Sequence, residues 1–276
     1  MMIIKLDDFS PMHTFDCGQC FRWEKQADES YIGVAGGRVV KISAKGNTVT
    51  IDGADESDFN SFWKKYLDAE RDYGSIKKQL RTIPLMDKAI NFGGGIRLLR
   101  QEFHETLISF IISQRSSIPK IKSCVARLCE LYGERIEFEG KDYYSFPSVE
   151  TLYSLSEEDF RALGVGYRAP YIVDAVKKLY SGELNEEFLL KCDTAAAREQ
   201  LLKVHGVGDK VCDCVLLFSL GKYDLFPSDV WIKRVMEESF DSHSAKETGE
   251  SLFKEYSGFA QQYLFYWRKY SEDENV

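Results

Sequence analysis

The sequence predicts an α+β protein, in which an N-terminal antiparallel β-sheet domain packs on a mostly α-helical core. Up to about residue 53, short runs of β-branched and aromatic residues lie between Gly, Asn and Lys turns, a pattern typical of antiparallel strands. From about residue 86 to the end of the chain, amphipathic segments of helical length end at or near a glycine. We therefore place a sheet domain with helices at residues 1–85 and a helical core at residues 86–276.

The N-terminal elements follow from local patterning. We expect strands in FRWEKQ, at residues 21–26, and in the longer stretch 31–52. A helix is predicted over residues 55–73, because the large apolar side chains there recur at intervals of three and four. Those side chains are Phe59, Phe62, Trp63, Tyr66 and Leu67.

The core is predicted to be a compact set of helices. HETLISFIISQ, at residues 104–114, is apolar enough to be a buried central helix. Further helices are expected in residues 118–133, 156–164, 168–182 and 196–206. Because no repeat of fixed period occurs, a solenoid is excluded.

Composition is typical of a globular protein that acts in the cytoplasm. The 276 residues are 44% apolar and 29% charged, and no apolar run approaches the ~20 residues of a membrane span. The first residues, MMIIKLDDFS, do not resemble a signal peptide. Seven cysteines, an odd number, favour reduced thiols over a disulfide framework. Cys17 and Cys20 have metal-ligand spacing, but no second CxxC accompanies them, so we expect no metal site there.

The net charge of −8 weighs against a protein that coats nucleic acid, because such binding depends on neutralising many phosphates. An enzyme with a local basic face remains compatible with this charge. Such an enzyme would hold DNA with helix N-termini and a few cations.

LLKVHGVGDKVCDCVLLFSL, at residues 201–220, has the pattern of a helix-hairpin-helix. We expect the first helix to end at Val204 or His205 and the second to begin near Asp209, with the motif spanning about 196–220. The glycines between them permit a tight turn, and the amides that open the second helix can bind a phosphate. An ordinary turn between two helices is the alternative.

Two side chains near this motif are candidates for chemistry. Lys210 and Cys214 share one face of the second helix, and an amine above a partly apolar surface becomes a candidate nucleophile. Asp229 follows Pro227 and Ser228 at a helix entry, so it is a candidate N-cap. It is also a carboxylate that could stabilise positive charge on a sugar. A solvated lysine and a purely structural aspartate are the alternatives.

Five ordered blocks of sequence resemble the eukaryotic-type 8-oxoguanine DNA glycosylases, a family of the helix-hairpin-helix glycosylase superfamily. The resemblance spans roughly residues 16–267. The blocks are CGQCFRW, FGGGIRLLRQEFHETLISFIISQRSSIPKI, LGVGYRAPYIVDAV, GVGDKVCDCVLLFSL and GFAQQYLF.

The resemblance implies a role for six residues around the damaged base. Lys210 matches the amine that attacks the sugar C1′, and Asp229 matches its supporting acid. Cys214 and Phe265 match the pair that sandwiches the extruded base, and Gln261 matches the reader of its pairing edge. Gly18 matches a glycine whose carbonyl accepts the N7 hydrogen that distinguishes 8-oxoguanine from guanine.

The resemblance also implies a DNA-binding surface. Tyr167 matches an aromatic wedge and Arg168 an arginine that faces the orphaned base. The remaining expected contacts are Gln114, Arg115, Lys120, His205, Gly206, Val207, Gly208 and Trp231.

This sequence departs from the family pattern at several of these positions. Arg115 stands in place of an asparagine and Lys120 in place of an arginine, and lysine cannot make the two-pronged contact of arginine. A preference for cytosine opposite the lesion is therefore in doubt. Trp231 replaces a histidine and His205 a hairpin proline, which predicts altered phosphate contacts with the chemistry retained.

Taken together, the residues and the resemblance predict a bifunctional glycosylase and abasic-site lyase that excises 8-oxoguanine from duplex DNA. No cofactor is expected, although carbonyls of the 204–208 hairpin could hold a monovalent cation. We expect a monomer whose partner is double-stranded DNA, with no membrane association. The alternatives are a glycosylase for another oxidised base and a non-catalytic helix-hairpin-helix DNA-binding protein.

Overall fold

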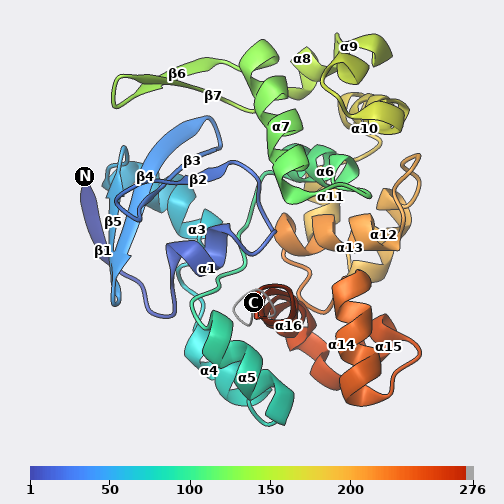
Figure 1. Ribbon diagram of the computed structural model, residues 1–276. Coiled ribbons are helices and arrows are strands. Elements are labelled where there is room, and N and C mark those ends of the chain that lie inside the picture. The colour runs from blue at the N-terminus through green and yellow to red at the C-terminus, as the bar shows by residue number, and fades with distance from the viewer. Residues whose placement is uncertain (272–276) are drawn as a thin grey trace.

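The computed structural model describes residues 1–271, so the last five residues of the predicted helical core lie outside the described residues. Figure 1 shows a β-sheet at one side of the molecule and helices on the other, with the last helix, α16, running between them. The predicted α+β architecture is confirmed.

The sheet is formed by five antiparallel strands in the order β1-β5-β4-β3-β2. Its face toward the rest of the N-terminal region is aromatic: the Trp23 ring stacks on Phe15 of α1, with ring centroids 3.8 Å apart. Gly33 lies beneath Trp23, and a Cβ atom there would come within 2.2 Å of the indole. Glycine is therefore what lets β2 and β3 pair under the tryptophan. The elements are β1 (Met2–Lys5), α1 (Pro11–Phe15), β2 (Trp23–Lys25), β3 (Tyr31–Ala35), β4 (Arg38–Lys45) and β5 (Thr48–Asp52).

The single helix predicted over residues 55–73 is wrong in extent. The segment forms α2 (Glu56–Asp58), a π-helical turn (Phe59–Trp63) and α3 (Lys64–Tyr66), and the backbone leaves the helix before Asp68, whose φ is +48°. The wider turn still brings Trp63 and Tyr66 onto the aromatic face of the sheet, where both are buried. Burial of these rings decided the local geometry, which the apolar spacing alone could not reveal.

The core contains the predicted helices together with others that were not individually predicted, and α6 is central and buried along nearly its whole length. The helices that precede the helix-hairpin-helix are α4 (Tyr73–Leu80), α5 (Pro84–Gly93), α6 (Phe103–Ile112), α7 (Ile118–Tyr132), α8 (Val149–Tyr153), α9 (Glu157–Ala162), a 3-10 turn (Gly166–Arg168), α10 (Ala169–Ser181) and α11 (Glu186–Lys191). The rest are α12 (Thr194–Leu201), α13 (Asp209–Phe218), α14 (Val230–Phe240), α15 (Ala245–Phe253), a 3-10 turn (Lys254–Tyr256) and α16 (Ser257–Tyr270).

Helix α4 belongs by its contacts to the helical part of the molecule. Its buried residues Tyr73, Ile76 and Leu80 join the same hydrophobic cluster as α5 and α16. In Figure 1, α4 and α5 lie together below the sheet, beside α16. The boundary at residue 85 stays a prediction, because the chain crosses between the two parts more than once.

The expectation that the chain is helical from residue 86 onward is wrong for one segment. Residues Arg135–Phe138 and Lys141–Tyr144 form an antiparallel hairpin, β6 and β7, between α7 and α8. Its turn residues Glu139 and Gly140 have φ values of +51° and +72°, as two-residue hairpins require. Phe138 and Tyr143 pack on the outer face of the sheet, so contacts far away in the chain stabilise the hairpin.

Among residues 1–271, no helix is long and apolar enough to cross a membrane. All seven cysteines are free, as expected.

Candidate active site

The turn between α12 and α13 opens the candidate site. Helix α12 ends at Leu201, earlier than the predicted Val204 or His205, while α13 begins at Asp209 as predicted. Gly206 has a φ of +78°, and a Cβ atom there would lie 2.3 Å from the ring of Tyr171 on α10. The hairpin can therefore lie against α10 only because this residue is glycine.

Lys210 lies in the first turn of α13, with its Nζ 5.0 Å from the centre of the Phe110 ring. One turn further along, Cys214 is 4% exposed. Burial raises the pKa of the Cys214 thiol, against an opposing effect of the Lys210 ammonium. The thiol is thus kept neutral, and it can serve as a polarizable packing surface close to the amine.

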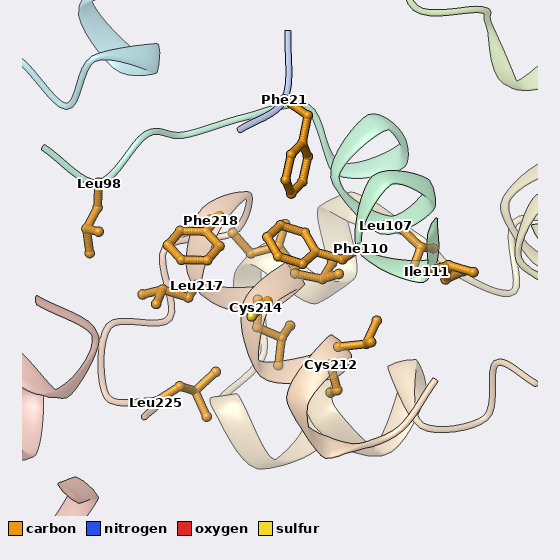
Figure 2. Close-up of a cluster of buried hydrophobic side chains, with 14 of the residues drawn as sticks. Phe21, Leu98, Leu107, Phe110, Ile111, Cys212, Cys214, Leu217, Phe218 and Leu225 are labelled. Carbon is orange, nitrogen blue, oxygen red and sulfur yellow. The ribbon is translucent and has the colours of Figure 1, made fainter. Parts of the chain in front are cut away.

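The aromatic layer under Lys210 continues into the protein core. Figure 2 shows Phe110 of α6 between Phe21 and the α13 side chains Cys214 and Phe218. The Phe110 ring lies 5.6 Å from Phe21 and is stacked 5.6 Å from Phe218. These rings exclude water from one side of the amine.

Asp229 is the N-cap of α14, as predicted. Its Oδ1 accepts hydrogen bonds from the backbone N–H groups of Trp231 and Ile232, both at 2.9 Å. Two fixed donors and the helix N-terminus stabilise the carboxylate and hold it in one orientation.

The other walls come from distant parts of the chain. Gly18, in the loop between α1 and β2, has a φ of +80°, and a Cβ atom there would lie 3.3 Å from the Phe265 ring. Gln261 of α16 is 5% exposed, and its Oε1 has no hydrogen-bond partner within residues 1–271. An unpaired buried acceptor costs about 1–3 kcal/mol, which a ligand that donates a hydrogen bond would offset.

All six residues assigned to the base by resemblance meet at one cavity of about 60 Å³, which we call the Lys210 cavity. The lining residues are Cys17, Gly18, Phe110, Lys210, Cys214, Phe218, Pro227, Asp229, Gln261, Gln262 and Phe265.

The Lys210 cavity adjoins a groove of about 690 Å³ with which it shares Gly18, Phe110, Lys210, Asp229 and Phe265. We call this second space the open groove. Its lining adds the predicted DNA contacts Gln114, Arg115 and Trp231. Gln114 Nε2 is buried without a partner among the described residues, a second polar atom that a ligand could satisfy. A long polymer could follow the groove while one unit of it entered the cavity.

Tyr167 and Arg168 lie together on the 3-10 turn before α10. Tyr167 is 49% exposed, as a side chain that enters DNA must be. The Arg168 guanidinium donates to the Gln114 carbonyl, at 2.8 Å from Nε, and to the carbonyls of Val165 and Arg115. In the free protein this guanidinium therefore fastens the turn that carries Gln114 and Arg115.

The remaining predicted contacts lie outside the linings of the cavity and the groove. Lys120 is exposed on α7, with its Nζ beside Gly164. Residues 205–208 form the hairpin, where the His205 N–H donates to Asp174 Oδ2 at 2.8 Å.

Sequence reasoning missed several residues that line the cavity and the groove, among them Phe110, Gln262 and Lys269. For Lys269 the sequence offered a sign, because it follows Phe265 by four residues and so shares its helix face. In the structure its Nζ lies 5.4 Å from the centre of the Phe265 ring. For Phe110 the sequence offered none, since one aromatic residue in an apolar helix looks like any other core residue.

A separate cavity of about 230 Å³ lies between the sheet, α7 and the β6–β7 hairpin. It contains none of the predicted site residues, and Phe21 separates it from the open groove.

Comparisons with known proteins agree with this geometry. Residues 1–107 match the family described as 8-oxoguanine DNA glycosylase, N-terminal domain. Residues 108–257 match the HhH-GPD superfamily of base excision DNA repair proteins.

Two solved structures resemble nearly the whole chain. A structure of MBOgg1 in complex with a low-affinity DNA ligand is 44% identical, with a TM-score of 0.95, over 98% of this chain and 96% of that one. The 8-oxoguanine glycosylase/lyase of Clostridium acetobutylicum, bound to duplex DNA with cytosine opposite 8-oxoguanine, is 41% identical, with a TM-score of 0.94. That match covers 100% of this chain and 99% of the other.

Curated relatives are more distant. A probable N-glycosylase/DNA lyase of Methanothermobacter thermautotrophicus is 32% identical over 62% of this chain and 62% of its own length. The N-glycosylase/DNA lyase OGG1 of Arabidopsis thaliana is 29% identical over 91% of this chain and 75% of its own. The chain thus matches less than two thirds of the archaeal relative.

Proposed function

Because this chain belongs to the 8-oxoguanine DNA glycosylase family within the HhH-GPD superfamily, we propose that it excises 8-oxoguanine from duplex DNA and then cleaves the strand. The observation that carries the proposal is the meeting of Lys210 and Asp229 at one cavity that adjoins the open groove. An amine and a carboxylate in that arrangement suit attack on a sugar carbon that becomes positively charged.

The chemistry needs no group beyond the chain and its substrate. As the bond from C1′ to N9 breaks, the base leaves with the bonding electrons and takes up a proton, while Asp229 stabilises the cationic sugar. The neutral Lys210 amine forms the new bond to C1′, and one of its protons passes to the ring oxygen as the bond from C1′ to that oxygen breaks, which leaves a protonated Schiff base. Loss of a C2′ proton then expels the 3′ phosphate, which cleaves the strand.

The Lys210 cavity accounts for recognition of the base. Cys214 and Phe265 supply two flat or polarizable surfaces for the ring faces. Gln261 supplies an unpaired acceptor for N–H groups on the pairing edge. The Gly18 carbonyl would accept the hydrogen that 8-oxoguanine carries on N7, where guanine has a lone pair.

Binding of the duplex would use the open groove and the surfaces beside it. Tyr167 would fill the gap left by the extruded base. For Arg168 to face the orphaned base, its guanidinium must first release the Gln114 carbonyl, so we propose that this arginine changes partner on binding. Lys120, Trp231 and residues 205–208 would contact the backbone, and a monovalent cation bound at the 204–208 carbonyls remains part of the proposal.

The test is borohydride trapping on duplexes with 8-oxoguanine opposite each of the four bases, using the wild type and Lys210→Gln. We expect a covalent complex with the wild type and none with the variant, and the yields would rank the opposite bases. If free base is released without trapping, excision is monofunctional and the role of Lys210 is wrong. If nothing is released, an oxidised pyrimidine substrate or plain DNA binding replaces this proposal.

We propose that the protein acts as a monomer in the cytoplasm, where its DNA substrate lies. Seven free thiols are compatible with that reducing compartment.

A further inference from the structure

Two walls of the Lys210 cavity come from opposite ends of the chain. One wall is the loop at residues 16–20, which contributes Cys17 and Gly18 and has no regular secondary structure. The other is α16, which contributes Gln261 and Phe265. A Cβ atom on Gly18 would lie only 3.3 Å from the Phe265 ring, so the loop backbone runs beside that ring.

The loop is tied to the helix that forms the opposite wall. Gln262 Nε2 donates to the Cys17 carbonyl at 2.7 Å, across 245 residues of sequence. Eight residues further along the same helix, the Tyr270 hydroxyl donates to the Asp16 carbonyl at 2.9 Å. Gln262 is 2% exposed, so its hydrogen bond forms away from competing water.

The other side of the loop is tied to a different segment. Gln19 Nε2 donates to the carbonyls of Thr14 and Arg97, both at 2.8 Å, and its Oε1 accepts from the Leu99 N–H. These bonds hold the loop on the rest of the protein, whereas the bonds from Gln262 and Tyr270 hold it on α16. Gly18 lies directly between the two anchored residues.

We propose that Gln262 is a positioning residue that holds the loop at residues 16–20 on α16, and so fixes the Gly18 carbonyl relative to Gln261 and Phe265. The inference rests on the proposed function, in which Cys214 and Phe265 cover the ring faces of the base and the Gly18 carbonyl accepts its N7 hydrogen. Because Gln262 holds the Cys17 carbonyl, the loop and α16 keep one separation, and the Gly18 carbonyl meets the edge of a base that lies on Phe265.

The test compares two reactions of the same enzyme. Excision of 8-oxoguanine needs the base between both walls, whereas cleavage at a preformed abasic site needs Lys210 and the sugar but no base. Gln262→Met removes the donor while keeping the side-chain volume. We expect the single-turnover excision rate to fall roughly 10- to 100-fold, as loss of one buried hydrogen bond implies. The ratio of excision to abasic-site cleavage should fall at least about tenfold.

A second measurement reads the cavity without chemistry. A duplex carrying 2′-fluoro-8-oxodeoxyguanosine resists excision, so its dissociation constant can be compared with that of an undamaged duplex. In Gln262→Met, the ratio of the dissociation constants for undamaged and damaged duplex should fall. The factor should be roughly the same as for the ratio of excision to abasic-site cleavage.

Tyr263→Phe is the matched control. Tyr263 is the next residue of α16, is 1% exposed, and donates from its hydroxyl to the Ile96 carbonyl at 3.5 Å. Its loss removes a buried bond from the same helix without touching the loop, so the excision ratio should stay at the wild-type value.

Two results for Gln262→Met would overturn the inference. A fall of excision and of abasic-site cleavage by the same factor would mean a general structural role. Unchanged rates of both reactions would mean that the loop keeps its place without this bond. A wild-type enzyme that neither excises 8-oxoguanine nor cleaves abasic sites would refute the proposed function itself, and this inference with it.

Discussion

Asp229 combines a structural and a proposed chemical role, and the two can be separated. Asparagine is as good an N-cap as aspartate but carries no charge. We expect the free energy of unfolding of Asp229→Asn to lie within about 0.5 kcal/mol of the wild-type value. Its excision rate should fall about 100-fold or more, because stabilisation of the cationic sugar is lost.

Asp229→Ala is the companion variant for that measurement. It should lose the same activity and, in addition, about 1 kcal/mol of stability, because the N–H groups of Trp231 and Ile232 lose their acceptor. Urea denaturation and single-turnover excision measure the two effects. Full activity in Asp229→Asn would show that the carboxylate only caps α14.

Arg115 occupies a backbone conformation that suits other residues better. Its φ is +48°, in the left-handed region where Asn and Gly are favoured. We expect Arg115→Asn to gain about 0.5–1 kcal/mol of stability, measured by urea denaturation. Its affinity for duplex DNA should fall, since a cation lining the open groove is removed.

Arg115→Lys separates the two effects, because lysine keeps the charge and the backbone strain. It should bind DNA nearly as the wild type does and show no gain in stability. Equal stability of Arg115→Asn and Arg115→Lys would contradict the argument from strain.

At the scale of elements, the helix-hairpin-helix depends on α10 as well as on its own two helices. The Asp174 carboxylate accepts from the His205 N–H of the hairpin and from Lys178, while Tyr171 packs under Gly206. Helix α10 also follows directly on the turn that carries Tyr167. One helix therefore relates the proposed wedge to the proposed phosphate-binding hairpin.

This arrangement predicts an acid-sensitive contribution to stability. Partial burial acts to raise the pKa of Asp174, but hydrogen bonds from Lys178 and the His205 N–H outweigh it, so the pKa is lowered. Because a lowered carboxyl pKa favours the folded state, the contribution is complete above the unfolded pKa of about 3.9 and is lost as the pH falls below it. In urea unfolding from pH 6 down to pH 2.5, the free energy of unfolding should fall less steeply for Asp174→Asn than for the wild type. Parallel curves would mean that this carboxylate is not coupled to folding.

At the scale of the whole molecule, a buried ion pair joins the sheet region to the helical core. Arg22, just after the loop at residues 16–20, pairs with Glu105 of α6 at 3.2 Å, and the side chains are only 9% and 12% exposed. Arg22 also donates to the Tyr144 carbonyl of β7. Three parts of the protein thus meet at one guanidinium.

Arg22→Met should therefore be strongly destabilising, by about 3–5 kcal/mol, because Glu105 is left as a buried unpaired charge. Burial already raises the pKa of Glu105 even though the Arg22 guanidinium lowers it, so the unpaired carboxyl should take up a proton more readily. The difference in unfolding free energy between Arg22→Met and the wild type should then become smaller as the pH falls from 7 toward 5.

The double variant Arg22→Met with Glu105→Leu is the control, since it removes both charges and should recover most of the stability. Urea denaturation of the wild type, Arg22→Met and the double variant measures this. A double variant no more stable than Arg22→Met would show that packing, not charge, is what was lost.

Several features of the site depend only on the local sequence. The glycines of the hairpin, the start of α13 at Asp209, the four-residue spacing of Lys210 and Cys214, and the cap at Asp229 each depend on neighbours within about one helical turn. Helix periodicity and capping act at that range, so these features could be predicted without knowledge of the rest of the chain. The same holds for four of the five sheet strands, which lie in the stretches where strands were expected.

Other features depended on contacts between distant residues. The β6–β7 hairpin is held by the outer face of the sheet, and the π-helical turn at Phe59–Trp63 by burial of its rings, neither of which local patterning reveals.

By itself, then, the sequence predicted most of the core helices, the turn between α12 and α13, and the shared face of Lys210 and Cys214, because these depend on local backbone preferences and spacing. Only the tertiary structure decided that the loop at Gly18 lies against Phe265 and Gln262 of α16. That contact joins segments 245 residues apart, as measured by the bond from Gln262 to Cys17. Which distant surfaces meet is set by packing of the whole core, so the width of the Lys210 cavity could be known only once the chain was folded.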